Sequence, residues 1–163
     1  MDKETAIAAF VGKKAGYYTE KWQQADDASP PALTGNIAAA LGGIFWLAYR
    51  KLYVPLLGVA GVVVLDTSLT GYLGDSMLLP LHVIAAWDQF STFVYAGVIG
   101  MLGNSWYWQK FRNTLAKARD ASPDPALQEA YLRERGGTSA LSAWGLLAVF
   151  VALISLLVLA TGS

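Results

Sequence analysis

The sequence contains no cysteine and only one histidine among its 163 residues. The first absence excludes disulfide bonds and thiolate metal sites, and the second excludes a metal site with several histidine ligands. Charged residues are also scarce, at 15% compared with roughly 25% in typical soluble domains. Hydrophobic residues, by contrast, make up 55% of the chain. So few charges on so apolar a chain favour a protein that lies in a lipid bilayer.

The charged residues that are present balance to a net charge of zero. Proteins that bind nucleic acids usually carry a basic patch, so this balance argues against a nucleic-acid partner. The sequence also has no G-x-S-x-G nucleophile motif, no H-E-x-x-H zinc motif and no phosphate-binding loop. We therefore expect a protein that is not an enzyme and that needs no cofactor.

Three hydrophobic runs are long enough to cross a membrane: residues 52–74, 78–103 and 140–160. A bilayer core about 30 Å thick requires about 20 apolar residues in a helix. A fourth run, residues 36–49, would extend only about 20 Å as a helix. We expect it to be a short re-entrant or interfacial helix, and a short spanning helix with an external N-terminus is the alternative. The sequence thus predicts a single all-α integral membrane domain with three full transmembrane helices.

Two further segments are polar enough to lie outside the bilayer, and we expect both to be cytoplasmic. Residues 3–27 place apolar side chains at helical spacing, which is typical of an amphipathic helix. Residues 104–137 combine many charged residues with an aromatic and apolar stripe made of Trp108, Phe111 and Leu115. We expect this stripe to contact a partner protein or the lipid surface.

Positively charged residues predict the orientation of the chain, because cytoplasmic loops of inner-membrane proteins are rich in Lys and Arg. Arg50 and Lys51 lie between two hydrophobic runs. The next cations follow two crossings later, and thus on the same side: Lys110, Arg112, Lys117 and Arg119. We therefore expect a multi-pass protein of the bacterial inner membrane with an extracytoplasmic C-terminus. The same cations either set the topology alone or also bind anionic lipid headgroups.

Asp66 and Asp88 are ionisable residues within two adjacent hydrophobic runs. Such residues are costly in hydrocarbon, so they usually face protein or water. Counted from the turn between the runs, the two carboxyl groups lie at similar depth, and a facing pair could share a proton, relay protons or bind a cation. In the alternative interpretation each carboxyl group is protonated, pairs with a basic group of a partner, or bonds to a polar neighbour. These neighbours are Thr67, Ser68, Gln89 and Ser91.

One histidine and two pairs of glycines complete the candidate residues. His82 could ligate a haem or a chlorophyll magnesium, but a lone histidine is more often a hydrogen-bonded polar residue. Gly58 with Gly61, and Gly97 with Gly100, allow helices to approach closely, either within the chain or between chains.

Four blocks of the sequence carry a distinctive pattern: FVGKKAGYYTEKW (residues 10–22), NIAAALGGIFWLAYRKLY (36–53), GNSWY (103–107) and GGTS (136–139). In these blocks, and above all in WLAYRKLY, the chain resembles the small bacterial inner-membrane proteins of the domain-of-unknown-function 2628 family. It departs from the family pattern at Gly35, where an aromatic residue is usual, and at Gly43 and Ile44, where a Gly-Pro pair is common. The resemblance implies a helical membrane protein and brings no catalytic residues.

Two functions are compatible with these features. The first is a non-catalytic accessory or scaffold subunit, or a binding partner, within a larger membrane protein complex. The second is a small oligomeric ion or proton transporter or channel in which Asp66 and Asp88 line the path. Three spans are few for a transporter, so we expect the first function. The expected partners are the lipid bilayer and other membrane subunits or further copies of the chain.

Overall fold

The structure is a computed structural model that describes residues 1–25, 31–76 and 78–161. Within these residues the regular structure consists entirely of α-helices, so the predicted all-α class is confirmed. The helices are α1 (Lys3–Val11), α2 (Ala15–Lys21), α3 (Ile37–Tyr49), α4 (Tyr53–Asp75), α5 (Leu81–Ala121), α6 (Pro125–Arg135) and α7 (Ala140–Thr161). The predicted end of the first amphipathic helix, residues 26 and 27, and Met77 of the GDSM turn lie outside the described residues.

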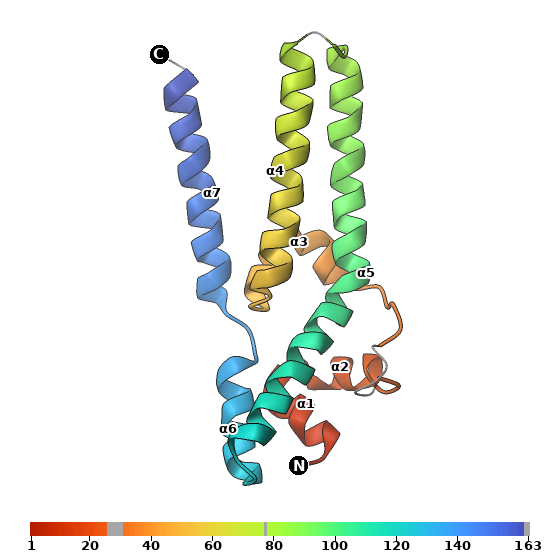
Figure 1. Ribbon diagram of the computed structural model, residues 1–163, viewed down its shortest axis with the longest axis vertical. Coiled ribbons are helices and arrows are strands. Elements are labelled where there is room, and N and C mark those ends of the chain that lie inside the picture. The colour runs from red at the N-terminus through yellow and green to blue at the C-terminus, as the bar shows by residue number, and fades with distance from the viewer. Residues whose placement is uncertain (26–30, 77, 162–163) are drawn as a thin grey trace.

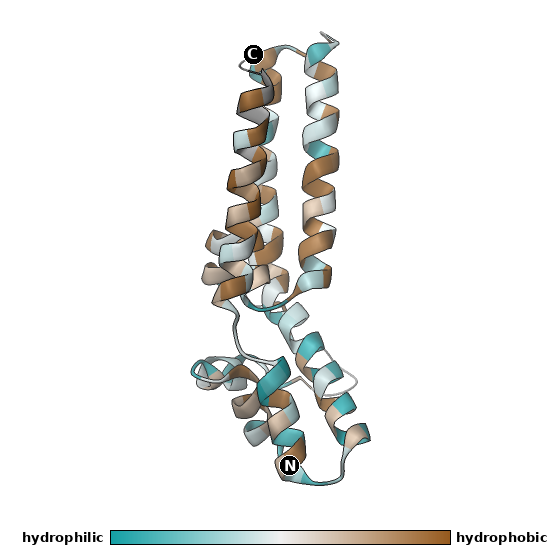
Figure 2. Cartoon of the chain, turned by 90° about the vertical axis from the view of Figure 1, so that its left-hand side faces the viewer, coloured by the Kyte–Doolittle hydropathy of each residue, from teal (hydrophilic) through white to brown (hydrophobic). Residues whose placement is uncertain are grey.

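Three long helical segments, α4, α7 and the first half of α5, extend toward one end of the molecule (Figure 1). The end of α7 lies at the same end as the turn between α4 and α5. Figure 2 shows hydrophobic residues along much of these segments and more hydrophilic residues at the opposite end. Within the described residues, two segments are long and apolar enough to cross a membrane: Tyr53–Asp75, which is α4, and Pro125–Leu153, whose apolar part belongs to α7.

The first half of α5 is not one of these candidate spans. Of the three predicted full spans, two are therefore supported, those in α4 and α7. The predicted crossing at residues 78–103 forms the start of a 41-residue helix that continues without a break to Ala121. This part of α5 includes His82, Asp88 and Gln89. These polar residues lower the mean hydropathy of the segment. The segment is therefore long enough to cross a membrane but less apolar than the other two.

A compact group of helices, which we call the basal module, lies at the other end of the molecule (Figure 1). It consists of α1, α2, α6 and residues 104–121 of α5. The region predicted as one helix, residues 3–27, forms two helices because Gly12 has a φ of 74°. Glycine adopts this left-handed conformation without the steric cost that other residues incur. The break lets α1 and α2 fold against each other and lets α1 reach α5 and α6.

The short hydrophobic helix α3 packs against the three long helices, since it contacts α4, α5 and α7. It is bent at Gly43, where φ is 51° and ψ is −132°. Its first half packs tightly on α5, because a Cβ added to Gly100 would lie 2.8 Å from the Cβ of Ala40. A Cβ added to Gly97 would meet no heavy atom of the described chain within 4 Å. Of this predicted glycine pair, Gly100 therefore serves packing within the chain.

Candidate functional site

The centre of the basal module is a cluster of buried aromatic rings. Five of them are at most 2% exposed: Phe10, Tyr18, Trp22, Tyr107 and Phe111. The rings of Trp22 and Phe111 are stacked with their centroids 5.6 Å apart, and the centroids of Tyr18 and Tyr107 are 5.0 Å apart. These separations are favourable for aromatic pairs. The cluster therefore holds α1 and α2 on the second half of α5.

The stripe predicted to contact a partner or the lipid surface lies in this core instead. Trp108, Phe111 and Leu115 are 4%, 1% and 7% exposed. The ring of Trp108 lies 5.3 Å from that of Trp22, and the ammonium group of Lys3 lies 5.2 Å from the Trp108 ring. The N-terminal helices of the same chain cover the stripe, so its three side chains are not available to another protein.

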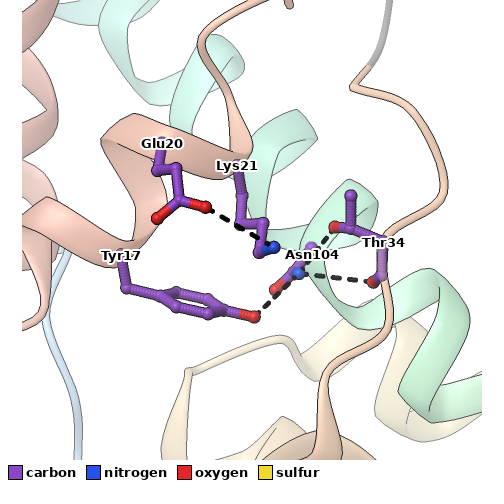
Figure 3. Close-up of polar contacts among 5 residues, drawn as sticks. All are labelled: Tyr17, Glu20, Lys21, Thr34 and Asn104. Carbon is purple, nitrogen blue, oxygen red and sulfur yellow. Dashed lines mark hydrogen bonds and ion pairs between the residues drawn. The ribbon is translucent and has the colours of Figure 1, made fainter.

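Asn104 is a fully buried polar residue beside the aromatic cluster. Figure 3 shows its side-chain amide among residues of α2 and of the segment before α3: Tyr17, Glu20, Lys21 and Thr34. The amide nitrogen donates to the hydroxyl groups of Tyr17, at 3.2 Å, and Thr34, at 2.9 Å. The amide oxygen accepts a hydrogen bond from the side chain of Asn36 at 2.8 Å. Asn104 thus connects three separate segments through bonds that burial makes costly to lose.

Arg50 is buried beside the same rings, with only 6% of its surface exposed. Its guanidinium carbon lies 5.0 Å from the ring centroids of both Tyr18 and Tyr107, which are cation–π distances. Its Nε and Nη1 atoms have no hydrogen-bond partner in the part of the chain that the structure describes, and it forms no ion pair there. Buried charges are usually paired. The positive charge of Arg50 is therefore compensated by aromatic faces rather than by a described carboxylate.

Lys110 places a second cation next to Arg50. Its Nζ donates to the backbone carbonyl groups of Arg50, at 3.1 Å, and Lys51, at 3.3 Å. Burial, together with the positive charges of Lys51 and Arg50, lowers the pKa of Lys110 to about 8. Burial also raises the pKa of the Tyr107 hydroxyl to about 12, although the charge of Arg50 opposes this shift. The result is a cluster of cations that is suited to hold an anion.

A protein-family model described as Protein of unknown function (DUF2628) matches residues 9–112, which is more than half of the chain. The chain belongs to this family. The family membership expected from the sequence is thus confirmed. No curated protein and no solved structure matches the chain.

The DUF2628 match contains all the rings of the aromatic cluster and ends before α6 and α7. Three of the four sequence blocks that resemble the family contribute side chains to this cluster: Tyr18, Trp22, Asn36, Arg50, Asn104 and Tyr107. The fourth block contacts it as well, because the Tyr107 hydroxyl donates to the carbonyl group of Gly137 at 3.4 Å. The sequence predicted for Arg50 a role in topology, with or without binding of lipid headgroups, and did not single out Asn104. The feature of the sequence that could have indicated this cluster is the recurrence of aromatic and amide residues in blocks that are distant from one another in the chain.

The two carboxyl groups predicted to lie within the membrane are not joined by a hydrogen bond in this DUF2628 protein. Asp66 accepts hydrogen bonds from the indole N–H of Trp87, at 2.8 Å, and from the hydroxyl of Tyr95, at 2.7 Å. Both donors belong to α5, so Asp66 connects α4 to α5. Asp88 is exposed. The described residues contain no group of three or more His, Cys, Asp or Glu side chains that could hold a metal ion.

The remaining candidate residues are less buried than the cluster. His82 is exposed in the first turn of α5, at the end of the molecule opposite the basal module. Arg112 is half-buried, whereas Lys117 and Arg119 are exposed on the second half of α5. Lys51 is half-buried and has a φ of 56°, which is uncommon for a residue with a side chain.

Proposed function

We propose that this DUF2628 protein is a non-catalytic subunit that serves as an accessory or scaffold within a larger membrane complex. The observation that carries this proposal is the exposed surface of α7. Among helix pairs of the described chain that share more than marginal contact, α7 packs against α3 alone. Its exposed side chains include Trp144 and Val149, with 68% and 57% of their surface accessible. A helix that is held at its base and is apolar along its length suits packing against a helix of another subunit.

A stripe of small residues along α7 supports this proposal. Gly145, Ala148 and Ala152 are exposed and are spaced so that they lie on one face of the helix. Small residues allow two membrane helices to approach closely, which strengthens their packing. The side of α7 that is partly covered within the chain includes Leu146 and Leu147.

We further propose that residues 81–103 of α5 cross the membrane together with α4 and α7. The bonds from Trp87 and Tyr95 to Asp66 support this arrangement, because they hold α5 beside a candidate span. The cations of the basal module favour a cytoplasmic position for that end, in a bacterial inner membrane. The end of α7 is then extracytoplasmic.

Cysteine labelling tests this topology, since the chain has no native cysteine. In intact cells a membrane-impermeant maleimide should label Ser76→Cys, in the turn between α4 and α5. It should label Lys117→Cys only after the membrane is permeabilised. Labelling of both positions in intact cells, or of neither position in any condition, would contradict the proposed three crossings.

Crosslinking from α7 tests the subunit role. In native membranes, Ala148→Cys carrying a short thiol-reactive photocrosslinker should form a discrete adduct with another membrane protein. Phe150→Cys, which lies on the other side of the same helix, is the matched control and should give much less of this adduct. An adduct of two copies of the chain would replace the accessory role with self-association. No adduct from Ala148→Cys would remove the support for a docking face on α7.

Asp66 and Asp88 motivate the alternative of an oligomeric ion or proton transporter. Both carboxylate oxygens of Asp66 already accept hydrogen bonds from α5. This arrangement favours a role in helix packing over a role in transport.

A further inference from the structure

A groove of about 1110 Å³ lies between the start of α4, the middle of α5 and the end of α6. Sites for small molecules typically have volumes of roughly 300–1,000 Å³, so this groove is large for a small metabolite. Its position between α4 and α5 connects a candidate membrane span with the basal module. A ligand that fills the groove would therefore extend along the helices.

The lining of the groove divides into two chemical halves. The apolar half includes five valines of α4 and α5: Val54, Val59, Val62, Val94 and Val98. The polar half contains four cations, Lys51, Lys110, Lys117 and Arg135, and one acid, Glu134. The change from cations to valines coincides with the start of the candidate span at Tyr53. Tyr53 and Trp106 also line the groove, and both residue types are enriched at the membrane–water interface.

The positive charge at the polar half exceeds what the lining acid can balance. Lys110 donates from its ammonium group to the carbonyl groups of Arg50 and Lys51, and the charge of the buried Arg50 guanidinium also acts on Lys110. Lys51 has the left-handed backbone conformation, a strain that tends to persist at functional sites. The lowered pKa of Lys110 reflects both burial and these neighbouring cations. A bound anion would relieve the repulsion among them.

We propose that this groove binds one anionic phospholipid, with its phosphate at Lys51 and Lys110 and an acyl chain along the valines of α4 and α5. The cations provide affinity for the phosphate, and the valines provide affinity for hydrocarbon. A free phosphate would leave the apolar half uncovered, and a lipid without a phosphate would leave the cations unpaired. A zwitterionic phospholipid would add the positive charge of its own headgroup to a site that already carries four cations. An apolar partner helix would bury the cations without a counter-charge. The lipid is the occupant that satisfies both halves.

Native mass spectrometry of the full chain in mild detergent tests the headgroup site. Phosphatidylglycerol should give a single saturable adduct, and phosphatidylcholine with the same acyl chains should bind much more weakly. The double variant Lys51→Gln/Lys110→Gln should lose roughly 30-fold in affinity for phosphatidylglycerol, because each lysine contributes about 1 kcal/mol at an anionic surface. The matched control, Lys13→Gln/Lys14→Gln, removes the same charge from exposed positions and should retain binding. Equal loss in both double variants would overturn the proposal.

A second pair of variants tests the acyl half while leaving the cations intact. Val62→Trp fills the groove, whereas Val64→Trp adds the same bulk at an exposed position of α4 that does not line it. Val62→Trp should reduce retention of long-chain phosphatidylglycerol at least fivefold, and Val64→Trp should not. If Val62→Trp binds the lipid normally, or if inorganic phosphate competes as well as the lipid, the groove is a simple anion site and the proposal fails.

A readout on the unmodified sequence covers the case in which a variant does not fold. Reductive ¹³C-methylation of the lysines allows the titration of Lys110 to be followed by NMR, with Lys110→Arg to assign its signal. Phosphatidylglycerol should shift the midpoint of this titration upward by at least half a pH unit, and phosphatidylcholine should not. An unchanged midpoint at saturating phosphatidylglycerol would contradict contact between the phosphate and Lys110. None of these measurements depends on a protein partner, so they can fail independently of the proposed subunit role.

Discussion

Replacement of Gly100 by alanine should destabilise the junction between α3 and α5, whereas the same replacement at Gly97 should not. Both glycines lie within α5, three residues apart. A methyl group at Gly100 would lie 2.8 Å from the Cβ of Ala40 and 3.5 Å from the backbone oxygen of Asn36. At Gly97 the added methyl would enter open space. The carbonyl group of Gly100 also accepts the N–H of Asn36 at 2.9 Å, so a shift of α3 would weaken a buried hydrogen bond.

The comparison of the two variants isolates the cost of the close contact. Alanine is favoured over glycine in a helix by about 1 kcal/mol, and this gain applies at both positions. Overpacking of a tight contact typically costs about 1–3 kcal/mol. Gly100→Ala should therefore be less stable than Gly97→Ala by about 1–3 kcal/mol. Gly103→Ala should lie between them, because its Cβ would come 3.1 Å from the Cβ of Ala39.

The assay is unfolding of the detergent-solubilised protein by increasing SDS, followed by circular dichroism and tryptophan fluorescence. A double-mutant cycle identifies the contact, since Ala40→Gly removes the methyl group that Gly100→Ala would meet. The pair Ala40→Gly/Gly100→Ala should be more stable than the sum of the single effects predicts, by at least about 0.5 kcal/mol. If the effects are additive, or if Gly100→Ala is as stable as Gly97→Ala, the close approach of α3 and α5 is refuted.

Three further changes follow from the polar contacts. Asn104→Leu should lower the free energy of unfolding by about 1–3 kcal/mol, because it leaves the buried amide of Asn36 without its acceptor; an equal effect of the exposed change Asn113→Leu would contradict this. Stability should rise between pH 8 and 9.5, because the pKa of Lys110 is about 8 in the folded protein and 10.5 ordinarily, so the unfolded chain binds more protons. The slope of the free energy of unfolding against pH should be below about 1.4 kcal/mol per pH unit and should vanish in Lys110→Met. The raised pKa of Tyr107 makes stability fall with pH instead, but this effect begins only near pH 10. Asp66→Asn should weaken the α4–α5 pair by about 1 kcal/mol, with Asp88→Asn as a near-neutral control, and neither should alter proton flux in proteoliposomes; a flux that depends on either carboxyl group would revive the transporter alternative.

The helical segments were predictable from the sequence, but their junctions were not. Hydrophobic runs and helical spacing indicate where α3, α4 and α7 lie, because these signals are local. The break at Gly12 depends on a backbone conformation that glycine permits but does not impose. The sequence predicted two separate segments that meet at Asn104, because the polarity of the chain rises there. In the structure both belong to the continuous helix α5, since a helix can run from an apolar segment into a polar one without interruption.

The candidate site was harder to predict because its residues meet only in three dimensions. Trp108 and Phe111 have the spacing of an exposed stripe or of a core, and the choice depends on where the N-terminal helices pack. Counted from the turn between α4 and α5, Asp66 and Asp88 lie at similar depth along their helices. The rotation of α5 determines that Trp87 and Tyr95, rather than Asp88, bond to Asp66. Helix rotation is a property of packing, which periodicity does not specify.

The adjacent cations Arg50 and Lys51 illustrate how topology and packing can be separated by experiment. Arg50 packs beside the rings of Tyr18 and Tyr107, whereas Lys51, which has a left-handed backbone conformation, lines the groove. Exchange of the two residues, Arg50→Lys/Lys51→Arg, preserves every charge that sets orientation in the membrane. A lysine at position 50 would place a strongly hydrated ammonium where a planar, weakly hydrated guanidinium now packs. The exchange should therefore leave maleimide labelling of the turn unchanged and lower the free energy of unfolding by about 1–2 kcal/mol, the magnitude of a desolvated cation–π contact. Unchanged stability would contradict a packing role for the Arg50 guanidinium and would leave the pair with the two roles that the sequence by itself suggests, topology and binding of lipid headgroups.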